Sequence, residues 1–196
     1  MNYMKTLFFT LIFELMIMKT FAQNSDHLSF KGVPITGTLK EYVSKMTQNG
    51  FTHIQTENGT AILRGDFAGY KDCTVGVSTL KQKDLVHKII VTFYVQDSWS
   101  ELSTNYFELK EMLTVKYGKP SDVVEKFDGD SQPNKDIDRM DEVRFDNCKY
   151  YSVWQTDKGV IQLSIDHNSV ISCFVKLLYF DKINSLKIKA KAMDDL

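Results

Sequence analysis

Three cysteines, Cys73, Cys148 and Cys173, are the most intrinsically nucleophilic side chains in this sequence. A catalytic cysteine needs its thiolate beside a base in a partly exposed, electropositive pocket. Cys73 and Cys173 alternate with apolar residues, so we expect them to point into a core, whereas Cys148, next to Lys149, is the best candidate for exposure. The sequence offers no assignable base for Cys148. An odd number of cysteines allows at most one intramolecular disulfide, and we expect these thiols to be mostly reduced and packed.

The four histidines are scattered, at positions 27, 53, 87 and 167. Zinc sites on helices or in fingers need closer spacing, such as His-x-x-x-His, and no such spacing occurs here. His53 and His87 fall in strand-like segments and are expected to be exposed. Asp166 directly precedes His167, but adjacency in sequence does not orient a catalytic base. The histidines therefore predict no metal site.

An acidic stretch over residues 128–141 is the remaining place where hard-ligand chemistry could occur. Its carboxylates are Asp128, Asp130, Asp136, Asp138 and Asp141. An EF-hand needs acidic residues at positions 1, 3 and 5 followed by glycine, and this pattern fails after Asp130. We therefore interpret the stretch as a solvated loop, with a Ca²⁺ site as the alternative.

Serine and phosphate chemistry find little support. The segment nearest to a nucleophile elbow is Gly76-Val77-Ser78-Thr79-Leu80, which lacks the second glycine and falls inside a predicted strand. Neither glycine-rich phosphate motif occurs, so the sequence predicts no nucleotide cofactor. No catalytic, cofactor-binding or metal-binding residue is assigned from the sequence.

Composition indicates a folded globular chain of 196 residues, with 43% hydrophobic and 25% charged residues. Lysine and arginine number 24 against 25 acidic residues. This balance gives no electrostatic signal for nucleic acid.

The first 23 residues have the layout of a secretory signal peptide. Lys5 supplies the positive start, an apolar run follows, and Thr20 and Ala22 are small residues before a cut near Ala22 or Gln23. Glu14 interrupts the apolar run, and an N-terminal amphipathic or core helix is the alternative. No later stretch reaches membrane-spanning length, so we expect no transmembrane segment in the mature chain. The prediction is a periplasmic or secreted protein with residues 24–196 as one α+β domain.

A capping box opens the first predicted helix. Thr38 can accept from the amide of Glu41, and the Glu41 carboxylate can reach back to the amide of Thr38. The apolar residues that follow have helical spacing: Leu39, Tyr42, Val43 and Met46. Gly50 is placed to end the helix.

Strand patterns surround that helix. Residues 30–35 predict a short edge strand before it, and after it strands are predicted at residues 51–55, 60–67, 72–80 and 85–95. Asn58-Gly59 fits a type I′ hairpin turn between the first two strands after the helix.

The same order then begins again at Ser98-Trp99-Ser100-Glu101, a second capping box. Its helix carries a stripe of Leu102, Tyr106, Leu109 and Leu113 and is ended by Gly118 and Pro120. Strands are predicted at residues 123–127, 142–156, 159–167 and 172–181, and a short final helix at residues 184–196, with lysines on its exposed side.

The order of elements is therefore helix then β-meander, twice, in halves of about residues 30–97 and 98–181. Because antiparallel meanders bury one face, the helices are the natural cover for it. The predicted fold is α+β, an antiparallel sheet of about seven or eight strands with helices on one face. A true duplication and a convergence of generic signals both remain open.

Several aromatic residues fall off the main strand alternation. The set considered is Tyr94, Tyr150, Tyr151, Trp154 and Phe180. They could form a second, exposed aromatic face that binds a peptide or another protein. The alternative is that they pack under the N-terminal segment or the final helix.

The sequence resembles a group of small exported Bacteroidetes proteins of unknown function. The likeness rests on the Phe-Ala-Gln end of the signal, on the segment Phe30-Lys31-Gly32-Val33-Pro34-Ile35-Thr36-Gly37-Thr38-Leu39, and on Gly65-Asp66-Phe67-Ala68-Gly69-Tyr70-Lys71, Tyr117-Gly118-Lys119-Pro120 and Asp181-Lys182-Ile183-Asn184. It implies export and transfers no catalytic residue. The helix-plus-meander order also resembles the β-lactamase-inhibitor-protein and outer-membrane-assembly lipoprotein folds, which is a fold analogy alone.

We therefore expect an exported, non-enzymatic protein that binds another protein or an envelope component through its sheet face or loops. One alternative is an enzyme with a site assembled from dispersed residues, of which Cys148, His167 and the loop 128–141 are the best parts. Another is a structural envelope protein without a small ligand.

Overall fold

The computed structural model describes residues 26–80, 83–129, 132–168 and 172–194. The segment interpreted as a signal peptide lies outside these residues, so export stays a prediction. Two short strands come first, β1 (Ser29–Phe30) and β2 (Val33–Pro34). They form a small antiparallel hairpin. The single strand expected over residues 30–35 is therefore wrong, because Lys31 and Gly32 both adopt positive φ and turn the chain between β1 and β2.

The first half continues with one helix and four strands. They are α2 (Leu39–Gln48), β3 (Thr52–Glu57), β4 (Thr60–Phe67), β5 (Tyr70–Leu80) and β6 (Lys83–Thr92). The capping box at the start of α2 is confirmed, with both reciprocal hydrogen bonds between Thr38 and Glu41. Asn58 and Gly59 have positive φ, as the predicted hairpin turn requires.

The second half repeats this order with an insertion. Its elements are α3 (Trp99–Tyr117), β7 (Asp122–Phe127), α4 (Asp136–Arg144), β8 (Cys148–Thr156), β9 (Gly159–His167) and β10 (Cys173–Asp181), followed by α5 (Lys182–Asp194). At the start of α3, the Ser98 hydroxyl accepts from the amide of Glu101, which confirms the predicted N-cap. The second capping box is only half formed, because the Glu101 carboxylate accepts from the Ser98 hydroxyl and not from the Ser98 amide.

Helix α4 corrects the interpretation of residues 128–141 as a loop. It occupies the second part of that stretch, and the strand expected over residues 142–156 begins only at Cys148. The helix buries just Met140 and Val143, three residues apart on one face. Two apolar positions among acidic neighbours were too few to give a helical stripe.

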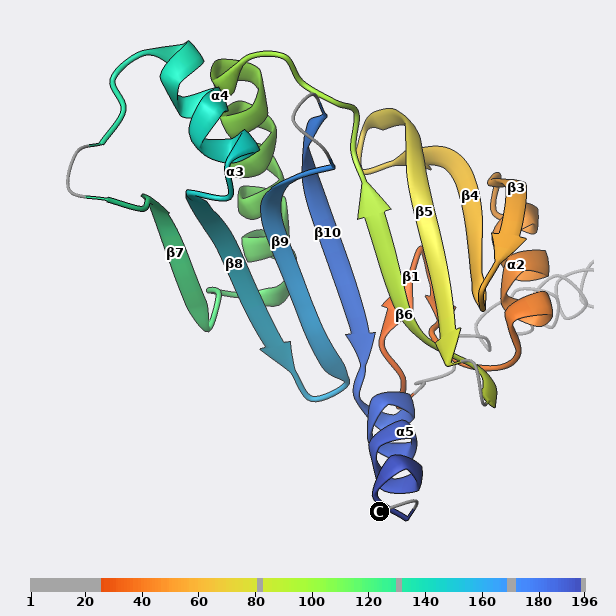
Figure 1. The fold of residues 1–196 in the computed structure, drawn as a ribbon. Helices are drawn as coiled ribbons and strands as arrows, with labels where there is room; N and C mark the ends of the chain where they lie inside the picture. The colour runs from red at the N-terminus through yellow and green to blue at the C-terminus, as the bar shows by residue number, and fades with distance from the viewer. Residues whose placement is uncertain (1–25, 81–82, 130–131, 169–171, 195–196) are drawn as a thin grey trace, which may run out of the picture.

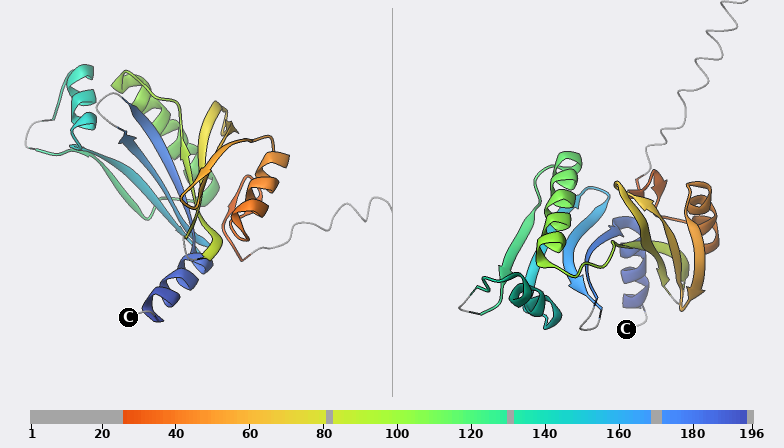
Figure 2. Two further views of the ribbon diagram at one scale, coloured as in Figure 1. Left: turned by 45° about the vertical axis from the view of Figure 1, so that its right-hand side comes forward. Right: turned by 90° about the horizontal axis from the view of Figure 1, so that it is seen from above.

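One sheet joins the two halves, in the order β3-β4-β5-β6-β10-β9-β8-β7 (Figure 1). Every pair of neighbouring strands is antiparallel. The last strands of the two halves, β6 and β10, meet in the middle, with Val91 opposite Leu177 and Ile89 opposite Tyr179. The predicted α+β fold with a helix-then-meander order in each half is confirmed, and Figure 2 shows that the sheet is strongly twisted.

A single hydrophobic core lies between one face of this sheet and the helices α2, α3 and α4. Tyr42 and Met46 of α2 and Leu102 and Tyr106 of α3 are fully buried in it. The sheet contributes alternate residues, including Leu63, Val75, Val91, Leu163 and Leu177. This alternation follows from the two-residue period of strands and leaves the other face of the sheet outside the core.

No helix within the described part of the chain combines the length and the apolarity needed to cross a bilayer.

Candidate functional site

The Cys148 thiol lacks the environment of a nucleophile. Burial raises the pKa of Cys148 to about 12, and the nearby Lys149 offsets only part of this shift. Cys73 and Cys173 are buried as predicted, and burial also raises their pKa values. All three cysteines are free thiols. A thiol that is protonated at neutral pH is a poor nucleophile, so these side chains serve the packing.

Asp166 and His167 do not form a dyad. Asp166 pairs with the Lys176 ammonium and accepts a hydrogen bond from the backbone amide of His167. The imidazole of His167 instead contacts the carboxylate of Asp146, with Nε2 and Oδ1 3.0 Å apart. Of the strand histidines, His53 is exposed as expected, but His87 is half-buried and burial lowers its pKa.

Three carboxylates of residues 128–141 have separate partners, and Asp138 makes no hydrogen bond or ion pair among the described residues. Asp128 lies 3.6 Å from the ammonium of Lys149, and Asp141 pairs with Arg144. Asp136 accepts hydrogen bonds from the backbone amides of Trp99 and Ser100. Within the described residues, no three His, Cys, Asp or Glu side chains are grouped as a metal site would require, and Asp130 lies outside these residues.

The face of the sheet opposite the core presents three rows of paired side chains, which we call the open face. Side chains paired in register point to the same side of the sheet. The rows are Ile62, Gly76, Ile90, Leu178, Gln162 and Val153 in the middle, Thr74, Thr92, Lys176, Ser164 and Tyr151 on one side, and Ser78, Lys88, Phe180, Val160 and Gln155 on the other. None of these residues belongs to the core.

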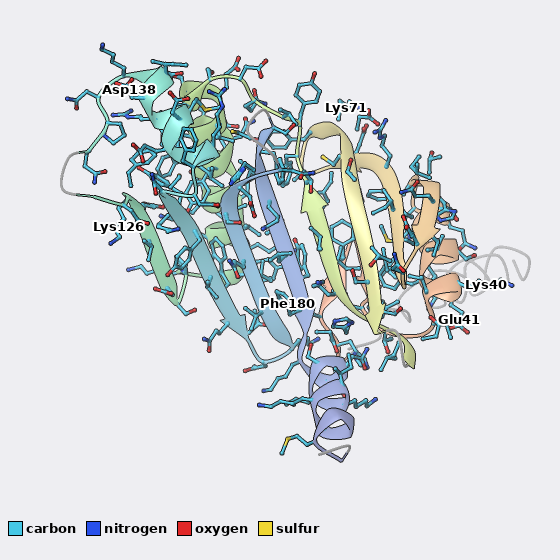
Figure 3. All side chains as sticks on the ribbon, in the orientation of Figure 1. Lys40, Glu41, Lys71, Lys126, Asp138 and Phe180 are labelled. Carbon is cyan, nitrogen blue, oxygen red and sulfur yellow. The ribbon has the colours of Figure 1, made fainter. Side chains whose placement is uncertain are left out.

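The predicted aromatic face is present only in part. Tyr151 and Phe180 lie on the open face, and Figure 3 locates Phe180 near the end of β10 that leads into α5. Tyr150 and Trp154 instead point toward the core, where Tyr150 packs on Trp99. Tyr94 is 74% exposed just after β6. Aliphatic side chains therefore make up more of the centre of this face than aromatic ones.

Two lysines lie near the middle of the open face, whereas Arg64 and Asp122 lie on the same face toward its outer strands. Lys88 lies over the ring of Phe180, 6.0 Å from its centroid. Burial lowers the pKa of Lys176, and the positive charge of Lys88 lowers it further. The carboxylate of Asp166 neutralises the charge of Lys176, so Lys88 carries the net positive charge of the group Lys88, Lys176 and Asp166. The face thus combines a half-buried apolar centre with a cationic side.

A cleft of about 370 Å³ lies where the open face meets α5. It is lined by Gln155, Thr156, Gly159, Val160, Phe180, Asp181, Lys182, Ser185, Leu186 and Lys189. Its volume lies within the range of small-molecule sites. We call it the α5 cleft.

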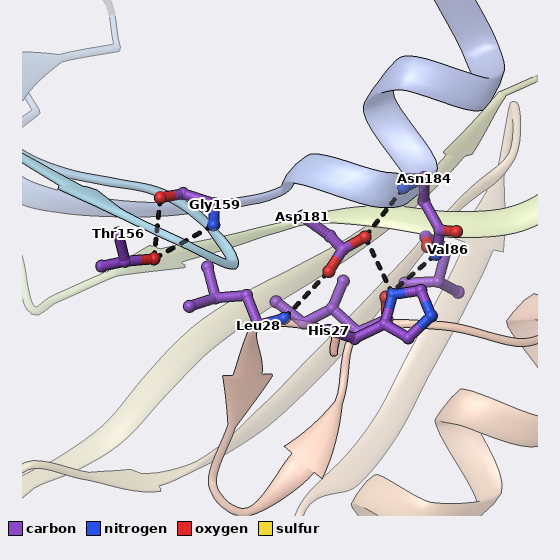
Figure 4. Close-up of polar contacts among 8 residues, drawn as sticks. His27, Leu28, Val86, Thr156, Gly159, Asp181 and Asn184 are labelled. Atoms are coloured by element: carbon purple, nitrogen blue, oxygen red, sulfur yellow. Dashed lines mark hydrogen bonds and ion pairs between the residues drawn. The ribbon is translucent and has the colours of Figure 1, made fainter. Parts of the chain in front are cut away.

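A buried carboxylate holds α5 in place beside the sheet (Figure 4). Asp181 accepts from the backbone amides of Leu28 and Asn184 and contacts the ring of His27, at 2.9, 2.8 and 3.0 Å. The Asn184 amide group donates to the carbonyl oxygens of Ile35 and Val86. The start of α5 is therefore tied to the residues just before β1, to β6 and to the segment after β2, which fixes one wall of the cleft.

Gly159 allows the other wall to approach closely. A Cβ atom at this position would collide with the carbonyl oxygen of Phe180. In the turn between β8 and β9, the carbonyl oxygen of Lys158 accepts a hydrogen bond from the backbone amide of Lys182. The sequence predicted the strands and the helix around this cleft, but not the cleft, because its walls come together through the β9–β10 pairing.

Comparison with known proteins returned no match, whether against protein-family models, curated proteins or solved structures.

Proposed function

We propose that this is an exported, non-enzymatic binding protein whose open face takes a segment of another protein. The observation that carries the proposal is a half-buried apolar row at the centre of an eight-stranded sheet, on the face that the core helices leave uncovered. Ile90, Leu178 and Val153 form its middle. Contiguous apolar surface framed by polar groups is typical of sites that bind proteins.

Polar groups on the same face favour an acidic partner segment. Lys88 has no carboxylate within ion-pair distance among the described residues, and it depresses the pKa of Lys176. An acidic group brought between these two ammonium groups would relieve their repulsion. The hydroxyl of Ser164, which pairs in register with Lys176, is buried and makes no hydrogen bond within the described part of the chain. The partner is therefore expected to present apolar side chains flanked by carboxylates.

The surroundings of the reactive side chains support a role without catalysis. The Cys148 thiol has a raised pKa, and His167 and Asp166 have different partners. Both carboxylate oxygens of Asp181 accept structural hydrogen bonds, so this group is not free to act as an acid or base in the α5 cleft.

Photo-crosslinking in cells that make the protein tests the binding face. A photoreactive residue in place of Leu178 should give one adduct of defined mass. The same residue in place of Val115, which is 84% exposed on α3, should give none.

The captured protein is then purified, and Ile90→Glu should weaken its binding by about tenfold or more, because a partner carboxylate would meet a new negative charge. Val115→Glu is the matched control and should change the affinity less than about twofold. Equal crosslinking from both positions, or full binding by Ile90→Glu, would overturn the proposal.

Export has its own test. The apolar run after Lys5 and the small residues Thr20 and Ala22 favour cleavage by a signal peptidase. Mass spectrometry of the protein recovered from the periplasm or medium should give a first residue of Gln23 or Asn24. Protein that carries an intact Met1 in that fraction would contradict the signal peptide.

A further inference from the structure

The α5 cleft has an apolar interior. Val160 and Phe180, paired in register across β9 and β10, form part of its lining, and Leu186 of α5 forms another part. Leu186 is 56% exposed. The cleft therefore offers apolar surface that no described part of the chain fully covers.

Unsatisfied polar groups accompany this apolar surface. The hydroxyl of Ser185 is buried and makes no hydrogen bond within the described residues. Lys182 and Lys189 also line the cleft, and neither has a carboxylate within 4.0 Å among the described side chains. The carboxylate of Asp181 is occupied by its own hydrogen bonds. The cleft thus has a net positive charge from Lys182 and Lys189.

We propose that the α5 cleft binds the anion of a single-chain carboxylic acid. The acyl chain lies against Val160, Phe180 and Leu186, and the carboxylate pairs with Lys189 and Lys182. Each part of such a ligand meets a group that otherwise lacks a partner. An alkyl ammonium would instead meet like charge, and an alcohol would leave the lysines unpaired.

The cleft shares Gln155, Val160 and Phe180 with one side row of the open face but none of the middle row, so either proposal can fail alone. Ile90 does not line the cleft. The Ile90→Glu variant should therefore keep its affinity for the acid even where it loses the partner protein.

Titration calorimetry of the purified chain with sodium decanoate, below its micelle concentration, tests the proposal. Saturable one-to-one binding is expected, and Lys189→Glu should weaken it by about tenfold or more. Lys187→Glu makes the same charge change on the same helix at a residue that does not line the cleft, and it should change the affinity less than about twofold. Decanol and decyltrimethylammonium should bind at least about tenfold more weakly than decanoate.

Three results would overturn the proposal. They are the absence of saturable decanoate binding, an equal loss of decanoate affinity in Lys187→Glu and Lys189→Glu, and an affinity for decyltrimethylammonium equal to that for decanoate. Vesicles of phosphatidylglycerol distinguish a free acid from a membrane lipid. Vesicle binding that is reduced equally by both lysine variants, without decanoate binding, would assign the lysines to general attraction by an anionic surface. Circular dichroism of each variant checks that the fold is retained.

Discussion

Burial raises the pKa of all three thiols, so the exposure of a cysteine residue does not by itself make its thiol reactive. Cys148 is only half-buried as a residue, yet its pKa is raised to about 12. At pH 8 this reduces the thiolate fraction more than about a hundredfold relative to an ordinary cysteine.

We therefore expect slow labelling of the native protein by a disulfide reagent at pH 8. In denaturant, all three thiols should react quickly, because the structure contains no disulfide among them. Peptide mapping of the labelled protein identifies the site. Labelling of native Cys148 at the rate of the unfolded chain would contradict the raised pKa.

Asn184 makes the second residue-level prediction. Its side chain is fully buried and donates to the carbonyl oxygens of Ile35 and Val86 at 3.0 and 2.9 Å. Asn184→Ala leaves both carbonyls without these partners, and a loss of about 2–4 kcal/mol in the free energy of unfolding is expected. Urea unfolding measures the change. Lys187→Ala, on an exposed position of the same helix, is the control and should alter it by less than about 0.5 kcal/mol.

At the scale of elements, the helices that open the two halves begin in the same way. Each has a Thr or Ser N-cap, Thr38 for α2 and Ser98 for α3. In each helix, the backbone amide of the first residue also donates a hydrogen bond to an aspartate from elsewhere in the chain. The amide of Leu39 donates to Asp84, and the amide of Trp99 donates to Asp136. The local cap could be predicted from sequence spacing, but the distant aspartate could not, because it depends on the folded chain.

Asp136 predicts a pH dependence for this arrangement. Hydrogen bonds, above all from the Ser100 hydroxyl, lower the pKa of Asp136 below its ordinary value. Asp136 then binds fewer protons in the folded chain than in the unfolded one. Its stabilisation is complete above the unfolded-state pKa of about 3.9 and is lost as the pH falls through the lowered folded-state pKa.

Asp136→Asn should therefore unfold at lower urea concentration than the wild type at pH 7, and the gap should narrow as the pH falls below about 4. Asp138→Asn is the matched control, because Asp138 lies in the same turn, is exposed, and makes no hydrogen bond to the described residues. If the urea midpoints of the wild type and Asp136→Asn differ as much at pH 2 as at pH 7, the charge of Asp136 does not contribute to stability.

At the scale of the whole molecule, local signals predicted the elements better than their assembly. Hydrophobic alternation in residues 159–167 and 173–181 identified β9 and β10, because each buries one face. The pairing of β6 with β10 joins segments about 90 residues apart, and no local pattern specifies it. The open face follows from the predicted sheet, whereas the α5 cleft needs both that strand order and the buried network around Asp181.

The central β6–β10 pairing predicts that the two halves depend on each other for stability. Both tryptophans, Trp99 and Trp154, lie in the second half, so their fluorescence reports on that half alone. Leu63 is a fully buried core residue of β4, in the first half. Leu63→Ala should lower the free energy of unfolding by about 2–5 kcal/mol through lost burial and a cavity.

If residues 24–196 are one cooperative domain, Leu63→Ala shifts the fluorescence and far-ultraviolet circular dichroism transitions by the same amount. The physical reason is that loss of the first half would remove β6 from the sheet and leave β10 as an unprotected edge strand. Leu163→Ala, at a fully buried β9 position, is the reciprocal variant and should also shift both signals together. A fluorescence transition that stays in place for Leu63→Ala while the dichroism moves would identify two independently unfolding halves, and the shared sheet would then be a docking interface between them.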